Sequence, residues 1–200
     1  MILGAPTLVA GVDEAGRGPL AGPVYAAAVV LPPGFDDRGI DDSKRLSEAE
    51  RDELAFRIRA ECVWSIATAD VAEIDRLNIL WATMAAMARA VRGLGLTPNL
   101  VEVDGNRVPH GMPCRTVAII DGDATHKHIG AASILAKTAR DAHMRELDAL
   151  YPEYGFARHF GYSTPEHKRA LLEFGPCPIH RMSFAPCRPD DQPCLDLDDL

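Results

Sequence analysis

The sequence predicts an α/β domain in which a mixed central sheet carries helices on both faces. Short apolar segments alternate along the 200-residue chain with longer amphipathic ones, as in a sheet covered by helices. One apolar segment, 24–31, has almost no polar residue, which is typical of a strand buried on both faces. The hydrophobic share of 47% and the charged share of 25% are ordinary for a soluble domain.

Two strands are expected near the start of the chain. Residues 8–12 are apolar and continue into Asp13 and Glu14, which a glycine-rich turn follows. Residues 24–31 are rich in Val and Ala and are followed by Pro-Pro-Gly, which ends the second strand. This arrangement leaves two carboxylates at the end of the first strand.

The next segments alternate between helix and strand. Ser47 and Glu50 form a capping box, which predicts a helix that ends near Ala60. Its inward side chains are expected to be apolar: Leu54, Phe56 and Ile58. Residues 62–69 alternate enough to predict a third strand, and Asp70 begins a second helix.

One helix and two strands are expected in the middle of the chain. The helix 79–94 has apolar side chains three or four residues apart. These are Leu80, Met84, Met87 and Val91. Strands 100–103 and 116–120 follow, the first ending at Asp104 and the second at the acidic segment 121–123. Acidic residues therefore terminate strands again.

The last part of the chain predicts helices. A long helix is expected over 129–150, and Thr164 followed by Pro165 predicts the start of the final one, in a C-terminal helical segment. Residues 1–185 are expected to form one domain. Residues 186–200, rich in Pro and Asp, are expected to form a disordered acidic tail.

Composition restricts the class of protein. No apolar run is long enough to cross a bilayer and the first residues do not resemble a secretion signal, so we expect a cytoplasmic protein, with a monomer as the default. The net charge of −8 disfavours a nucleic-acid partner at first sight. However, residues 187–200 hold one arginine against five aspartates, and four more carboxylates belong to the candidate site described next. The remaining body is nearly neutral and can carry local basic patches.

The five cysteines are scattered without a Cys-x-x-Cys pair, which favours reduced thiols over disulfides. A structural zinc site would draw on Cys177, His180, Cys187 and Cys194. The wide spacing of the later ligands disfavours this alternative.

The most informative pattern is a set of acidic residues at three strand ends: Asp13, Glu14, Asp104 and Asp123. Strand ends on one side of an α/β sheet meet, so the four carboxylates can converge. Their mutual repulsion favours hard divalent cations, Mg²⁺ or Mn²⁺, which take oxygen ligands. Two such ions about 4 Å apart can orient a water for attack on a phosphodiester and stabilise the leaving oxygen. The hypothesis is phosphoryl chemistry.

Simpler explanations exist for each segment alone. Asp and Gly are common turn formers, although three coincident sites weaken that explanation. Segment 121–123 would suit a calcium loop, but no EF-hand spacing surrounds it. The turn Gly16, Arg17 and Gly18 matches neither a P-loop nor the dinucleotide motif, which disfavours nucleotide cofactors. Its glycines allow close backbone approach to a sugar or phosphate, and a plain turn between strands is the alternative.

These segments together resemble the ribonuclease HII family, the type 2 ribonucleases H. The resemblance opens with Gly-Val-Asp-Glu-Ala-Gly-Arg-Gly-Pro-Leu-Ala-Gly-Pro at 11–23 and continues almost to Phe184. Further motifs follow in the family's order at 42–47, 77–80, 104–106, 131–137, 154–156 and 161–162. The Gly-Arg-Gly turn favours this family over its HIII relatives.

The resemblance implies a ribonuclease H-like fold and a role for each candidate residue. It makes the four acidic residues the catalytic carboxylates, holding two Mn²⁺ or Mg²⁺ ions when substrate is bound: Asp13, Glu14, Asp104 and Asp123. It assigns the ribose 2′-hydroxyl to the backbone of Gly16, Arg17 and Gly18. It assigns the sugar of the adjoining deoxynucleotide to Tyr162. Three further residues are candidate substrate contacts, with solvation as the alternative for the two cations: Lys44, Arg45 and Asn106.

Some positions depart from the family pattern. Phe160 stands where Lys is frequent, and Asp121 and Ala124 flank Asp123 where Lys and Ser are frequent. Asp121 is therefore an alternative ligand in place of Asp123. Three histidines lie near the site in sequence but are expected at the surface, without a catalytic role: His126, His128 and His159.

The implied activity is hydrolysis of the RNA strand of RNA/DNA hybrids and cleavage 5′ of single ribonucleotides in duplex DNA, leaving 3′-hydroxyl and 5′-phosphate ends. The implied roles are ribonucleotide excision repair and RNA primer removal. Two alternatives stay open. One is another nuclease of the same architecture, such as a junction resolvase, which would not require a 2′-hydroxyl. The other is a hybrid-binding module without turnover, against which the intact carboxylates count.

Overall fold

The computed structural model describes residues 8–40 and 46–188, which are built around one five-stranded sheet. The strand order is β3-β2-β1-β4-β5. The strands are β1 (Val9–Ala15), β2 (Val24–Val30), β3 (Val63–Ala69), β4 (Leu100–Asp104) and β5 (Thr116–Ile119). β1 in the centre is antiparallel to β2 and parallel to β4, so the sheet is mixed, as predicted.

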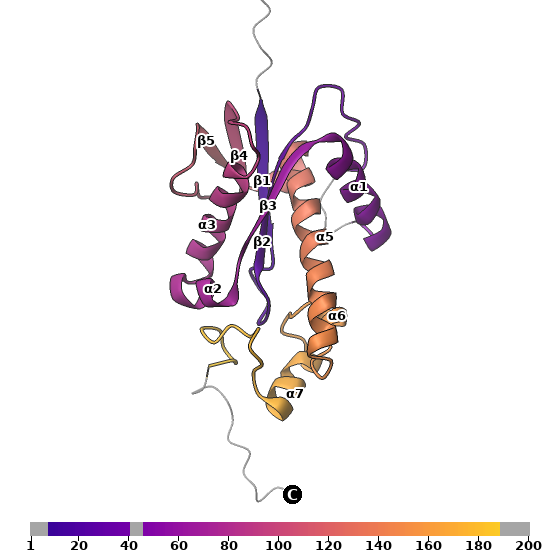
Figure 1. Ribbon diagram of the computed structural model, residues 1–200, viewed down its shortest axis with the longest axis vertical. Helices are drawn as coiled ribbons and strands as arrows, with labels where there is room; N and C mark the ends of the chain where they lie inside the picture. The colour runs from indigo at the N-terminus through magenta and orange to yellow at the C-terminus, as the bar shows by residue number, and fades with distance from the viewer. Residues whose placement is uncertain (1–7, 41–45, 189–200) are drawn as a thin grey trace, which may run out of the picture.

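Helices cover both faces of the sheet (Figure 1). On one face lies α3 (Ile79–Arg92), preceded by α2 (Val71–Leu77), and its buried side chains pack with β1, β2 and β4. On the other face lie α1 (Glu48–Glu61) and α5 (Lys127–Leu150), which form a second apolar cluster with β2. The predicted α/β architecture is therefore confirmed.

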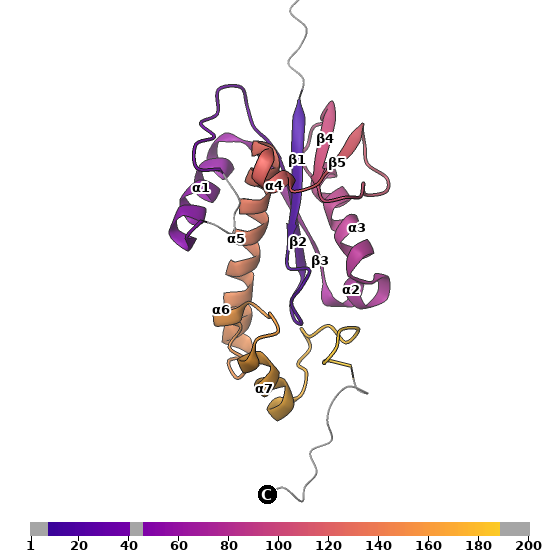
Figure 2. The same ribbon diagram turned by 180° about the vertical axis from the view of Figure 1, so that it is seen from behind.

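A C-terminal segment lies beyond the end of the sheet (Figure 2). It contains α6 (Phe156–His159) and α7 (Pro165–Phe174) and has its own apolar cluster with the end of α5. Thr164 caps α7 and Pro165 is at its start, as predicted. The segment returns to the turn after β1, because Ala21 forms a β-bridge with His180.

Capping motifs in the sequence predicted the starts of several helices correctly, but the burial of one side chain in α1 was predicted wrongly. Ser47 and Glu50 form the expected capping box at the start of α1. Phe56, expected to point inward, is 73% exposed. Because it follows the buried Leu54 by two residues, it lies about 200° around the helix from that side chain. The short helices α4 (Gly122–Thr125) and α6 were not predicted.

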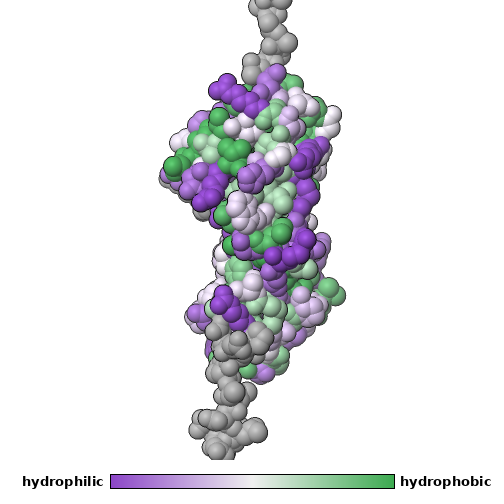
Figure 3. All heavy atoms as spheres, turned by 90° about the vertical axis from the view of Figure 1, so that its left-hand side faces the viewer, coloured by the Kyte–Doolittle hydropathy of each residue, from purple (hydrophilic) through white to green (hydrophobic). Residues whose placement is uncertain are grey.

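The surface of the sheet region is not uniform. Polar and apolar side chains interleave on the face that includes α3 and β5 (Figure 3). Among the described residues, no helix combines the length and apolar character needed to cross a membrane.

Three histidines form a buried cluster in the C-terminal segment, which corrects the expectation that His159 is at the surface. The Nε2 atoms of His167 and His180 are 2.9 Å apart, and the rings of His159 and His167 stack with centroids 4.6 Å apart. His159 is only 7% exposed. Burial lowers the pKa of His180 to about 4 and also lowers the pKa of His167. His167 and His180 are therefore neutral imidazoles at neutral pH.

This cluster predicts loss of stability in acid. A histidine whose pKa is lower in the folded state contributes stability above its unfolded pKa, and that contribution is lost as the pH falls through the interval between the two values. For His180 the interval runs from 6.5 to about 4, and the expected loss is about 3 kcal/mol. Urea unfolding at pH 7.5, 6 and 4.5 measures it. The variant His180→Asn should show a weaker pH dependence, and equal slopes would contradict the assignment.

Candidate active site

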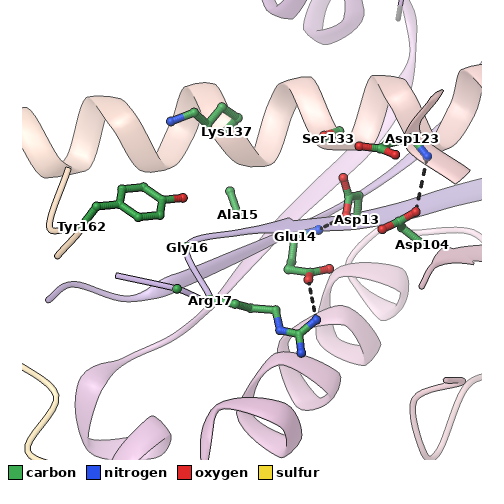
Figure 4. A pocket seen from close by; sticks show the side chains of 11 residues that line it. Asp13, Glu14, Ala15, Gly16, Arg17, Asp104, Asp123, Ser133, Lys137 and Tyr162 are labelled. Carbon is green, nitrogen blue, oxygen red and sulfur yellow. Dashed lines mark hydrogen bonds and ion pairs between the residues drawn. The ribbon is translucent and has the colours of Figure 1, made fainter. Parts of the chain in front are cut away.

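A cavity of about 250 Å³ opens between β1 and α5 (Figure 4). Its walls come from β1, the turn after it, β4, α4, α5 and the loop after α6. The lining residues are Asp13, Glu14, Ala15, Gly16, Arg17, Gly18, Asp104, Asp123, Ser133, Lys137 and Tyr162. The four predicted carboxylates, the predicted turn and the predicted tyrosine therefore meet at one place.

Parallel pairing of β1 and β4 brings the first carboxylates together. Val12 pairs with Val103, so Asp13 and Asp104 follow on neighbouring strands at the same edge of the sheet. Asp104 Oδ1 accepts hydrogen bonds from the amides of Gly122 at 2.8 Å and Asp123 at 3.4 Å. The sequence predicted Asp123 at a strand end, but it lies in the short helix α4. The hydrogen bonds of Asp104 connect the first turn of that helix to the sheet.

Asp13 is buried beneath α5. The helix approaches β1 closely because residue 11 is glycine, where a Cβ would lie 2.1 Å from the carbonyl carbon of His128. Burial and the charges of Glu14 and Asp104 raise the pKa of Asp13 well above its usual range. Hydrogen bonds from the Ser133 side chain and the Glu14 amide act in the opposite direction. The two hydrogen bonds therefore do not fully offset the cost of a negative charge on the buried Asp13 side chain.

Glu14 faces the opposite side of the strand and is partly compensated. Its Oε1 lies 3.1 Å from Nη1 of Arg17, the middle residue of the turn. Burial raises the pKa of Glu14, and the Arg17 guanidinium limits that rise. Arg17 therefore links the acidic cluster to the turn.

The donor set fits a hard divalent cation. All four acidic side chains offer carboxylate oxygens, and burial together with the neighbouring charges of Glu14 and Asp104 raises the pKa of Asp13. No three carboxylate, imidazole or thiol groups of the described ranges are spaced to hold an ion in the present side-chain arrangement. In this arrangement Glu14 Oε1 is engaged by Arg17.

Two cavity residues were not assigned a role from the sequence. Ser133 and Lys137 lie four residues apart on α5, so they share one face of the helix above β1. Lys137 pairs with Asp141 at 2.7 Å, and its ammonium lies 4.9 Å from the Phe160 ring centroid. The i, i+4 spacing of these two polar residues on a largely apolar part of the helix is the sequence signal that could have indicated them.

Other candidates lie elsewhere. Lys44 and Arg45 are outside the described residues. Asn106 is exposed and Asp121 is exposed, and neither lines the cavity, which favours Asp123 over Asp121 as the fourth carboxylate. His128 does not line the cavity, and its Nε2 lies 2.5 Å from Glu102 Oε2.

The cysteines have ordinary surroundings. The four cysteines within the described ranges are free thiols: Cys62, Cys114, Cys177 and Cys187. Of the residues considered for zinc, Cys177 Sγ lies 3.1 Å from His180 Nδ1, at hydrogen-bond distance. Cys194 lies outside the described residues.

Sequence comparison gives one family. The model of the Ribonuclease HII family matches residues 10–187. The chain is 59% identical over 181 residues to Ribonuclease HII of Chromobacterium violaceum, covering 90% of this chain and 91% of that protein. It is 57% identical over 184 residues to Ribonuclease HII of Bordetella pertussis, with coverage of 92% and 91%.

Solved structures share the ribonuclease H-like fold. The ribonuclease H2 of Pyrococcus horikoshii has a TM-score of 0.77 at 27% identity, covering 92% of this chain and 97% of that one. The RNase HII of Archaeoglobus fulgidus, solved in complex with PCNA, has a TM-score of 0.76 at 27% identity, with coverage of 96% and 100%. Bst-RNase HIII in complex with Mn²⁺ has a TM-score of 0.69 at 17% identity, covering 90% and 68%, and at this identity shows the fold alone.

Proposed function

The chain belongs to the ribonuclease HII family and is an endoribonuclease, and from this premise we propose that it hydrolyses the RNA strand of RNA/DNA hybrids and cuts 5′ of single ribonucleotides in duplex DNA. The products are a 3′-hydroxyl and a 5′-phosphate. The proposed roles are ribonucleotide excision repair and RNA primer removal, carried out by a cytoplasmic monomer.

One observation supports this function above the others. Four carboxylates from β1, β4 and α4 line the same cavity as the Gly-Arg-Gly turn and Tyr162. A group of acidic ligands alone would suit many phosphoryl-transfer enzymes. A turn with free backbone donors and an aromatic side chain beside it adds the means to recognise a sugar.

The carboxylates are proposed to hold two Mg²⁺ or Mn²⁺ ions when substrate is present: Asp13, Glu14, Asp104 and Asp123. Such ions activate a water and stabilise the charge of the leaving oxygen. Hydrogen bonds already hold two of these carboxylates in place. Ser133 holds Asp13 by a hydrogen bond, and the amides at the start of α4 hold Asp104. Arg17 holds Glu14 in the absence of metal, and a bound cation would take the place of its guanidinium beside this carboxylate.

The turn and the tyrosine are proposed to recognise the RNA–DNA junction. The amides of Arg17 and Gly18 are available to the 2′-hydroxyl, since no described residue accepts a hydrogen bond from either. The Tyr162 ring is 43% exposed and packs beside Gly18, where a Cβ would lie 3.6 Å from the ring. Gly18 and the exposed ring therefore lie next to each other on the cavity wall, where both can contact one sugar. Lys137 is a further cation on the cavity wall.

One assay tests the function. A duplex with a single ribonucleotide and its all-DNA twin are incubated with the protein and Mn²⁺, Mg²⁺ or a chelator. We expect one cut 5′ of the ribonucleotide, dependent on metal, and at least about a thousandfold slower cleavage of the all-DNA twin. Equal cleavage of both duplexes would favour a different nuclease of the same architecture. Binding without cleavage under every metal condition would favour the hybrid-binding module.

A further inference from the structure

Two arginine side chains are fully buried beneath the turn that follows β1. Arg140 of α5 is 1% exposed and Arg181 of the C-terminal segment is 0% exposed. Burial lowers the pKa of Arg181 to about 9, and the charge of Arg140 acts in the same direction. Both side chains still carry a charge at neutral pH. The fold therefore places two like charges side by side in its interior.

Backbone carbonyls satisfy these guanidinium groups, and two of the three that Arg181 binds belong to the turn itself. Its Nη2 donates to the carbonyl of Gly16 at 2.5 Å and its Nη1 to the carbonyl of Arg17 at 2.9 Å. Its Nε and Nη2 both donate to Gly22 O, at 3.0 and 2.8 Å. Arg140 instead donates to three carbonyls outside the turn: Ala21, Pro23 and Phe160.

The carbonyls that Arg181 binds determine where two amides point. In a trans peptide the C=O and the following N–H are directed to opposite sides. The carbonyls of Gly16 and Arg17 are turned inward to Arg181, so the amides of Arg17 and Gly18 are turned outward, on the side of the cavity that both residues line. A positive charge on the carbonyl oxygens also polarises these peptide groups and makes their N–H groups stronger donors.

Stability is a poor explanation for this arrangement. Removing two guanidinium groups from water is costly, and replacing such buried charges with apolar side chains is often neutral or stabilising. Among the described residues, the carboxylate that offsets the charge of Arg181 is Asp75, which accepts hydrogen bonds from the amides of Met182 and Ser183. A buried charge of this kind is better explained by the geometry that it imposes.

We infer that Arg181 is a positioning residue for recognition of the ribose 2′-hydroxyl, acting by fixing the carbonyls of Gly16 and Arg17 so that the two outward amides meet the substrate. The inference rests on the proposed function of the turn. Arg181 itself lies behind the turn, and it would not touch the substrate. The chemical class recognised is a ribose within duplex nucleic acid.

The test is the full-length variant Arg181→Lys, whose single ammonium cannot span three carbonyls. Two constants are measured with Mn²⁺: kcat/KM for a duplex with one ribonucleotide, and the inhibition constant of the all-DNA twin as competitor. We expect kcat/KM to fall about 30-fold, the value of one or two lost hydrogen bonds, with the inhibition constant changed less than about threefold. Calorimetric affinity for Mn²⁺ alone should be unchanged. Arg181→Gln, which keeps a donor without the charge, should show the same split.

The matched control is Asp75→Asn, which loosens the same C-terminal segment without touching the turn. It should lower the melting temperature but leave both constants as in the wild type, and all assays are run below every melting transition. The inference is overturned if Arg181→Lys and Arg181→Gln keep the wild-type ratio of the two constants, or if both constants worsen together. A wild-type protein that cuts the all-DNA twin as fast as the ribonucleotide duplex would instead overturn the proposed function of the site.

Discussion

Asp13→Asn is expected to lower the cleavage rate on a ribonucleotide-containing duplex by a thousandfold or more, which corresponds to about 4 kcal/mol of activation free energy. Asp13 is the carboxylate nearest the centre of the acidic cluster, between Glu14 on its own strand and Asp104 on the next. An amide of the same shape keeps the packing under α5 but is a weaker ligand for a hard cation. Single-turnover cleavage with Mg²⁺ and with Mn²⁺ measures the loss.

The same variant should not be less stable than the wild type in metal-free buffer. A carboxyl group whose pKa is raised on folding destabilises the folded state as the pH rises above its unfolded pKa, because the folded protein must then hold the unfavourable charge. Asparagine removes that charge, so its melting temperature at pH 7.5 should equal or exceed the wild-type value. Full cleavage activity in Asp13→Asn would contradict the assignment of this carboxylate.

Asp121→Asn is the matched control. It makes the same chemical change at an exposed carboxylate that lies two residues from Asp123 but does not line the cavity. Asn also tolerates the left-handed backbone of Asp121, whose φ is 53°. Activity should therefore remain close to the wild-type value. A large loss in this variant would make Asp121 the fourth ligand in place of Asp123.

The elements that were predicted correctly have short-range causes. The capping box of Ser47 and Glu50, and Thr164 followed by Pro165, involve only neighbouring residues, so the sequence contains the whole interaction. Phe56 was placed wrongly because the inward side of α1 is set by where the helix meets α5. α4 was missed because it spans one turn and depends on Asp104, which is distant in sequence.

The residues of the candidate site could be predicted from the sequence, but the buried residues that hold them in position could not. The acidic residues follow strands, and parallel strands end at a common edge, so their convergence followed from the pattern. The buried residues behind the site did not follow from any sequence pattern. Arg181 is 165 residues from Gly16, and His167 and His180 are polar residues whose burial no periodicity indicates. These groups become visible only when the C-terminal segment is seen packed against the turn.

Gly11→Ala is expected to destabilise the protein by about 3 kcal/mol or more and to lower its melting temperature by about 10 °C. The added Cβ would lie 2.1 Å from the carbonyl carbon of His128 and 2.3 Å from the amide nitrogen of Ile129. Both contacts are with backbone, so no side-chain rotation can relieve them, and α5 must move away from β1. Thermal melts and urea unfolding measure the loss.

Movement of α5 should also impair the site, because this helix carries the Ser133 side chain that hydrogen-bonds Asp13. We therefore expect weaker Mn²⁺ binding and slower cleavage at temperatures where Gly11→Ala is still folded. Gly95→Ala is the control, since no atom lies within 4 Å of its added Cβ and the expected cost is only the ~1–2 kcal/mol of its left-handed backbone. It should keep wild-type cleavage. Equal stability of the two variants would mean that close contact between α5 and β1 does not hold the carboxylates in place.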